Sequence, residues 1–168
     1  MRSAASLPHA REGAARAWLY TAFVAALVVL VDQLSKAAIR GSLTPGETRS
    51  VLPGLQLVDT RNRGVAFGFL PGRHLAVSVL VAIALLVLLV YFLRNHSRPL
   101  IWLPTGMLVG GALGNILDRL RSGSVTDFVK LPLGWPPFNL ADASITIGVI
   151  LLLYLSEASS RSSPPARS

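Results

Sequence analysis

Four long runs of apolar residues divide the chain into hydrophobic and polar segments. They cover residues 18–39, 75–93, 99–117 and 138–156. About 20 mostly apolar residues are needed for a helix to cross the hydrocarbon core of a bilayer, and each run approaches that length. The pattern therefore predicts an all-α integral membrane protein with four transmembrane helices.

The polar segments predict the remaining organisation. Within the first loop, residues 41–72, apolar and polar residues alternate around a Pro-Gly pair between residues 50 and 59, which is typical of short strands joined by a turn. We expect these strands to form a small β platform on the membrane surface. Residues 1–16 and 157–168 are rich in Arg, Ser, Ala and Pro and are predicted to be disordered tails of a membrane domain spanning residues 17–156.

Composition supports a membrane protein and excludes several other classes. The chain is 52% hydrophobic and 14% charged, with mean hydropathy +0.55, whereas soluble domains have about 25% charged residues. The net charge of +8 comes from scattered Lys and Arg residues, which suit anionic lipid headgroups better than nucleic acid. The chain has no cysteine, and its three histidines lie in separate segments, so we expect no metal, no cofactor, no thiol chemistry and no His-based triad.

The first run also resembles a signal peptide, because Arg11 and Arg16 precede it. It ends in Asp32 and Gln33 without a small-residue cleavage site, and three further runs follow, so a retained helix is favoured.

Four spans place both termini on one side of the membrane and the first and third loops on the other. Basic residues beside the spans favour cytoplasmic tails.

Two acids, Asp127 and Asp142, are the candidate catalytic pair. They flank a loop rich in Pro, Gly and aromatic residues, and the four-span topology brings them to the same membrane face. Two carboxylates that meet in a site of low dielectric share one proton, as in aspartic proteases. Spacing alone slightly favours another interpretation, in which Asp142 caps the fourth helix and Asp127 is a loop acid facing water.

Other polar residues near the spans have both structural and functional interpretations. Asp32 and Lys36 are spaced as an i,i+4 ion pair that would anchor the first span. Asp118 and Arg119 follow the third run, where a polar cluster that reaches the headgroups and pairs with Asp32 or Lys36 is favoured over direct chemistry. Asn62 lies in a predicted turn, and its amide could equally hold a substrate backbone.

The third run is also organised for close helix packing. Gly106, Gly110 and Gly114 repeat every four residues and would lie along one side of a helix, where a neighbouring backbone can approach. Gly111 and Asn115 lie on the adjacent stripe.

Five segments together resemble the signature blocks of the bacterial lipoprotein signal peptidases, also called signal peptidase II or prolipoprotein signal peptidases. They read DQLSK at 32–36, NRGVAFG at 62–68, GGALGNILDR at 110–119, VTDF at 125–128 and FNLADASI at 138–145. Each is weak alone, but all five occur in the family order. Thr126, where the family more often has an apolar residue, and Arg63, where Thr or Ser is usual, depart from the pattern.

The resemblance implies a function and assigns roles to residues. Asp127 and Asp142 match the catalytic dyad of a membrane aspartic endopeptidase. Asn62, Asn115, Arg119 and Asn139 match substrate-binding or pocket positions, and Asp32, Lys36 and Asp118 match supporting polar positions. The first loop would be the family's extracytoplasmic β platform, which helps to clamp substrate.

The resemblance also implies a substrate and a location. The substrate would be a diacylglyceryl-modified prolipoprotein in the lipid bilayer, cleaved on the amino side of its lipid-modified cysteine to release the signal peptide. The location would be the bacterial inner membrane, with the active site outside the cytoplasm. We expect a monomer without a nucleic-acid partner.

Two other membrane functions fit the sequence less well. A small multi-span transporter or proton-conducting protein would also keep acids in its spans, but near the bilayer midplane, whereas Asp32, Asp118 and Asp142 are predicted near span ends. A Ser/Lys peptidase is excluded because Ser35 and Lys36, adjacent on a helix, point about 100° apart.

Overall fold

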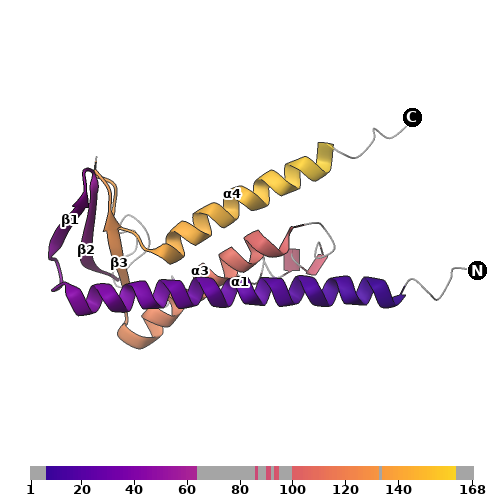
Figure 1. Ribbon diagram of the computed structural model, residues 1–168, viewed down its shortest axis with the longest axis horizontal. Coiled ribbons are helices and arrows are strands. Elements are labelled where there is room, and N and C mark those ends of the chain that lie inside the picture. The colour runs from indigo at the N-terminus through magenta and orange to yellow at the C-terminus, as the bar shows by residue number, and fades with distance from the viewer. Residues whose placement is uncertain are drawn as a thin grey trace, which may run out of the picture.

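Three helices and a three-stranded sheet make up the part of the chain that the computed structural model describes, residues 7–63, 100–132 and 134–161 with positions 86, 90, 91, 93 and 94. The elements are α1 (Leu7–Ser42), β1 (Thr48–Leu52), β2 (Leu55–Asn62), α3 (Trp102–Ser122), β3 (Val125–Lys130) and α4 (Leu140–Arg161). Figure 1 shows the sheet at one end of the helices, where α1 and α3 end and α4 begins. The predicted span at residues 75–93 lies outside the described residues, apart from positions 86, 90, 91 and 93.

The helices depart from the predicted boundaries at both tails. α1 has 36 residues and begins at Leu7, and α4 continues to Arg161. The helices thus extend into residues 7–16 and 157–161, which the sequence pattern assigned to the tails. Polar residues continue a helix that packing elsewhere has already nucleated, because adding one residue to a formed helix is far easier than starting a new one.

Two described helices, Gly13–Ser42 and Leu140–Ala158, are long and apolar enough to cross a membrane. Several of the large apolar side chains that remain exposed on α1 recur at helical spacing and form an outward stripe: Leu19, Phe23, Leu27, Leu30 and Leu34. Contiguous apolar surface of this kind is unfavourable in water and suits contact with lipid.

Close helix packing follows the predicted glycine pattern. α3 packs between α1 and α4. A Cβ atom at Gly110 would lie 2.7 Å from the backbone oxygen of Ala25 on α1, and one at Gly111 would lie 2.5 Å from that of Ala141 on α4. The two neighbouring stripes of α3 therefore allow close approach to two different helices.

The sheet corrects the all-α prediction. The Pro-Gly turn joins β1 to β2 as expected, but a third strand, β3, follows α3 and pairs antiparallel with β2, so the sheet order is β1-β2-β3. The β platform is thus built from two loops. Phe128 on β3 packs with Ile39 of α1 and with Leu43, the residue that follows this helix, which fixes the sheet to the end of the helices.

The glycine contacts predict the effect of adding one methyl group. Gly110→Ala should lower the melting temperature in detergent, because its Cβ would meet Ala25 and Val28 of α1; overpacking of this kind costs about 1–3 kcal/mol. Gly13→Ala is the control, because nothing lies within 4 Å of its Cβ position. Equal melting temperatures for the two variants would contradict close packing at Gly110.

Candidate active site

Asp127 lies in the middle of β3 and is only 2% exposed. Its two carboxylate oxygens accept hydrogen bonds from different amides: Oδ2 from Asn62 Nδ2 at 2.9 Å and Oδ1 from Asn139 Nδ2 at 2.7 Å. The interpretation of Asp127 as a loop acid facing water was therefore wrong. The strand buries the carboxylate and presents it to the start of α4.

Asp142 lies in the first turn of α4 and forms a reciprocal capping pair with Asn139. The Asp142 backbone N–H donates to Asn139 Oδ1 at 2.9 Å, and the Asn139 N–H donates to Asp142 Oδ2 at 3.3 Å. The geometry is that of a capping box, in which Asn139 is the N-cap. Asp142 thus contributes to capping, as the alternative interpretation expected, but its second oxygen accepts from Asn115 Nδ2 at 2.8 Å.

Asn139 connects the two carboxylates. Its side-chain amide donates to Asp127, and its backbone amide donates to Asp142. The residue has no exposed surface, so its orientation is determined by these partners. The two aspartates, 15 positions apart in the chain, therefore meet around one asparagine at the same end of the helices.

Behind the aspartates lies a buried ion cluster centred on Lys36. Its ammonium is 2.8 Å from Asp32 Oδ2 and 3.3 Å from Asp118 Oδ2, and Lys36 and Asp32 are 0% exposed. The predicted i,i+4 pair is confirmed. The expectation that Asp118 reaches the headgroups was wrong, because it is buried and also accepts the N–H of Thr126 at 3.1 Å.

Glycine and helix-end geometry make room for this cluster. A Cβ atom at Gly114 would lie 2.6 Å from Asp32 Oδ2, so only glycine leaves space there. Asp32 Oδ1 accepts the backbone N–H of Ala141 at 3.0 Å, which satisfies a donor in the first turn of α4. Asp32 therefore links all three described helices.

The remaining predicted residues differ in their closeness to the aspartates. Asn62 and Asn115 each donate to one carboxylate, so the interpretation of Asn62 as only a turn residue was wrong. Arg119 Nη1 donates to the backbone oxygen of Asn115 at 3.3 Å. The Arg119 guanidinium is partly buried, and the carboxyl groups of Asp142 and Asp127 lie near it.

Sequence reasoning missed two polar residues that stabilise the surroundings of the site. Gln33 Nε2 donates to Asp118 Oδ1 at 3.1 Å and to the backbone oxygen of Gly114 at 3.2 Å. Asp59 is buried and binds Arg61 Nη2 at 2.8 Å. The signals were present: Gln33 is a polar residue in a predicted span, and Asp59 and Arg61, two positions apart, share one face of a strand.

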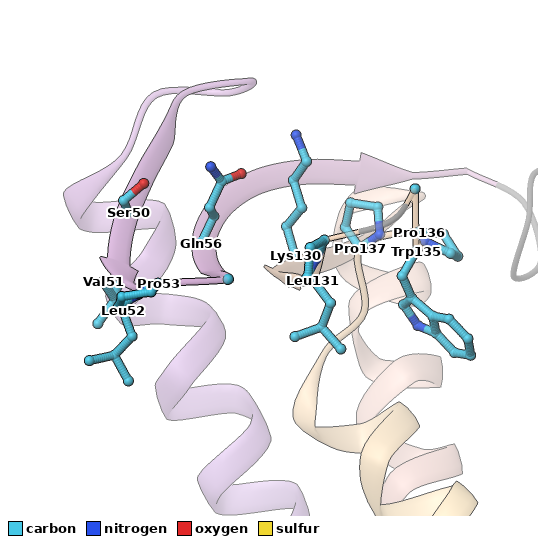
Figure 2. A pocket seen from close by; sticks show the side chains of 13 residues that line it. Ser50, Val51, Leu52, Pro53, Gln56, Lys130, Leu131, Trp135, Pro136 and Pro137 are labelled. Atoms are coloured by element: carbon cyan, nitrogen blue, oxygen red, sulfur yellow. The ribbon is translucent and has the colours of Figure 1, made fainter.

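A groove of about 790 Å³ lies beside the aspartates rather than around them. It is formed by the tip of the β1-β2 hairpin and the segment after β3. In Figure 2 the side chains of Leu52, Leu131 and Trp135 point towards the helices, whereas Gln56 and Lys130 point away from them. Neither aspartate lines this groove, so it is not where the chemistry would occur.

The site is suited to proton transfer. Burial and the neighbouring Asp142 raise the pKa of Asp127 to about 6, although hydrogen bonds from Asn62 and Asn139 oppose the shift. A carboxyl group with a pKa near neutrality can both accept and donate a proton under physiological conditions. Because Asn139 donates to both carboxyl groups, Asp127 and Asp142 are expected to titrate as a coupled pair.

Comparison with known proteins shows similarity over most of the chain. Residues 24–157 match the family described as Signal peptidase (SPase) II. A lipoprotein signal peptidase of Syntrophomonas wolfei is 45% identical over 130 residues, covering 77% of this chain and 87% of that protein. A lipoprotein signal peptidase of Burkholderia mallei is 36% identical over 158 residues, covering 90% and 93%.

The fold is also similar to solved structures. One, described as a bacterial membrane enzyme at 2.3 Å resolution, has a TM-score of 0.78 and 30% identity, and the match covers 88% of this chain and 94% of that one. A second bacterial membrane enzyme, at 1.9 Å resolution, has a TM-score of 0.68 and 34% identity over 80% and 90% of the two chains.

The raised pKa predicts a pH-dependent effect of Asp127→Asn on stability. The folded chain holds a proton on Asp127 between its ordinary pKa of 3.8 and about 6, where the unfolded chain releases it. The stabilisation that the folded chain gains from this bound proton is complete below about pH 4 and is lost as the pH rises through 6. The variant should therefore gain stability relative to the wild type as the pH rises from about 4 to about 6, by up to about 3 kcal/mol, and the difference should level off at higher pH.

Melting temperatures measured across this range test the prediction. Asparagine offers one acceptor oxygen where aspartate offers two, so the variant also loses a hydrogen bond, but that loss is the same at every pH. A difference between variant and wild type that does not change with pH would contradict the raised pKa.

Proposed function

The chain belongs to the signal peptidase II family, and on that premise we propose that Asp127 and Asp142 are the catalytic dyad of a membrane aspartic endopeptidase that removes signal peptides from prolipoproteins. The observation that carries the proposal is that Asn139 donates hydrogen bonds to both carboxylates. The similarity to lipoprotein signal peptidases over most of the chain supports the substrate class.

The proposed chemistry needs one water molecule and the one proton shared by the dyad. The ionised carboxylate takes a proton from water as the water oxygen attacks the scissile carbonyl, and the protonated carboxyl gives its proton to the carbonyl oxygen. In the second step the C–N bond breaks. The carboxyl that took the water proton gives it to the leaving amine, and a hydroxyl of the tetrahedral intermediate gives its proton to the other carboxylate, which restores the proton shared by the dyad. The products are a signal peptide with a new carboxylate and a lipoprotein with a new amino terminus.

We further propose that the substrate carries a diacylglyceryl group on the cysteine that follows the scissile bond. The site lies where α1 and α3 end and α4 begins, beside the sheet (Figure 1). A lipid-anchored substrate moving in the bilayer plane would present its scissile bond near this depth. Arg119 is a candidate to hold the substrate, since it is partly buried beside the dyad.

The location that this chemistry favours is the bacterial inner membrane, with the dyad on the extracytoplasmic side and a monomer as the working unit. In Figure 2 apolar side chains of the groove, Leu52, Leu131 and Trp135, point in the direction in which the helices run. Tryptophan and leucine in that position suit the boundary between headgroups and acyl chains. We propose that the sheet rests on the membrane surface and helps to hold substrate over the dyad.

Transport or proton conduction is the less favoured function. The buried acids Asp32, Asp118, Asp127 and Asp142 connect to one another through hydrogen bonds at the sheet end of the helices. A conducting path would need ionisable groups farther along the spans.

The dyad predicts the loss of cleavage in two variants. Asp127→Asn and Asp142→Asn should each lower the rate of signal-peptide release by about 10²–10⁴-fold or more, because each removes a group that accepts or donates a proton. The rate is measured as a gel shift of a diacylglyceryl-modified prolipoprotein with purified protein in detergent.

Glu47→Gln is the matched control, since this acid is exposed on the hairpin and bonds locally to Thr44; it should cleave at the wild-type rate. Melting curves establish that each variant is folded. Full activity in either dyad variant would overturn the assignment of catalysis to that residue. A folded wild-type protein that leaves the lipid-modified precursor intact would overturn the substrate class.

A further inference from the structure

The side-chain amide of Asn115 lies between the buried lysine and one aspartate of the proposed dyad. Its Nδ2 donates to Asp142 Oδ1 at 2.8 Å. Its Oδ1 accepts from Lys36 Nζ at 3.0 Å and from Asn139 Nδ2 at 3.2 Å. Two donors converge on the oxygen, so the amide has only one favourable orientation, with its NH₂ group towards Asp142.

Lys36 is itself held in place on every side. Its ammonium has three hydrogens to donate and three acceptors within reach: Asp32 Oδ2 at 2.8 Å, Asn115 Oδ1 at 3.0 Å and Asp118 Oδ2 at 3.3 Å. It is 0% exposed, and a buried charge with fixed counter-ions has little freedom to move. Asn115 therefore receives its hydrogen bond from a rigid donor.

We propose that Lys36 is a positioning residue for the hydrolysis, acting through Asn115 to orient the carboxylate of Asp142. The inference rests on the proposed function and deepens it. Without Lys36, the oxygen of Asn115 loses its charged donor, and the amide can rotate away from Asp142. The competing explanation is that Lys36 only neutralises Asp32 and Asp118 and contributes to stability alone.

A double-mutant cycle in kcat separates these explanations. Lys36→Met and Asn115→Ala should each lower kcat by about tenfold or more with a smaller change in KM, because a misplaced carboxylate affects the transition state more than substrate binding. If Lys36 acts through Asn115, the double variant should be no slower than Asn115→Ala alone, within about twofold. Losses that multiply would overturn the proposal.

Gln33→Met is the matched control for the same cycle. Gln33 donates to Asp32 at 3.3 Å and to Asp118 at 3.1 Å, as Lys36 does, but its other contacts are with the backbone of Gly114 and with Arg121, not with Asn115. It should lower the melting temperature and leave kcat within about twofold of wild type. A kcat loss in Gln33→Met equal to that in Lys36→Met would assign the effect to the two acids and overturn the role of Asn115.

A charge-balanced variant covers the case in which Lys36→Met fails to fold. Asp32→Asn combined with Lys36→Met removes one negative and one positive charge together. The asparagine oxygen can still accept the N–H of Ala141 that Asp32 accepts at 3.0 Å. The combined variant Asp32→Asn, Lys36→Met then replaces Lys36→Met in the double-mutant cycle with Asn115→Ala, and the expected outcome is the same.

A further variant, Asn115→Asp, leaves Lys36 unchanged. The new carboxylate can still accept from Lys36 and Asn139 but would repel Asp142, whereas its protonated form restores a donor. Its kcat, as a fraction of wild type, should rise as the pH is lowered from about 7 to 5. A fraction that does not change with pH would overturn the proposal.

Charged groups from every packed element surround this position. α1 contributes Asp32 and Lys36, α3 contributes Asp118 and Arg119, β3 contributes Asp127 and α4 contributes Asp142. Expressing each rate as a fraction of wild type at the same pH removes the titration that both proteins share. If the folded wild-type protein cleaves no prolipoprotein, the proposed function fails; if it cleaves but the losses multiply, only the role of Lys36 fails.

Discussion

The structure depends on the high free-energy cost of placing charged groups away from water. Five ionisable side chains, Asp32, Lys36, Asp118, Asp127 and Asp142, lie at the sheet end of an apolar helical domain. A buried charge is tolerated only where fixed partners replace its hydration. Here the partners are an ammonium, asparagine amides and backbone N–H groups. Each carboxylate therefore determines where a neighbouring element must lie.

The glycine stripes of α3 let the helices approach closely enough for the buried charges to reach their partners. Close approach of α1 at Gly110 and of α4 at Gly111 brings three helices within hydrogen-bond distance of one another. Gly114 leaves room for Asp32, which then reaches Lys36 on its own helix and the backbone of Ala141 on α4. Small residues and buried charges thus depend on each other, since a wider spacing would leave the charges without partners.

The same arrangement prepares the site for hydrolysis. Asn139 caps α4 and also donates to Asp127, so the start of a helix and the middle of a strand are held in register by one side chain. Groups fixed before substrate arrives need little reorganisation during the reaction. Burial and mutual repulsion of the two aspartates raise the pKa of Asp127 towards neutrality, where proton exchange is most useful.

Local sequence patterns were sufficient for the three helices that the structure describes, the Pro-Gly hairpin, the glycine packing stripe and the i,i+4 pair of Asp32 and Lys36, because each depends on residues a few positions apart. Two acids near span ends, with the family resemblance, were also enough to nominate Asp127 and Asp142. Only the tertiary structure decided that Asp127 lies in a third strand, that Asp118 is buried, and that Asn139 rather than Asp142 is the N-cap. Those outcomes depend on pairing between segments far apart in the chain, which local periodicity does not encode.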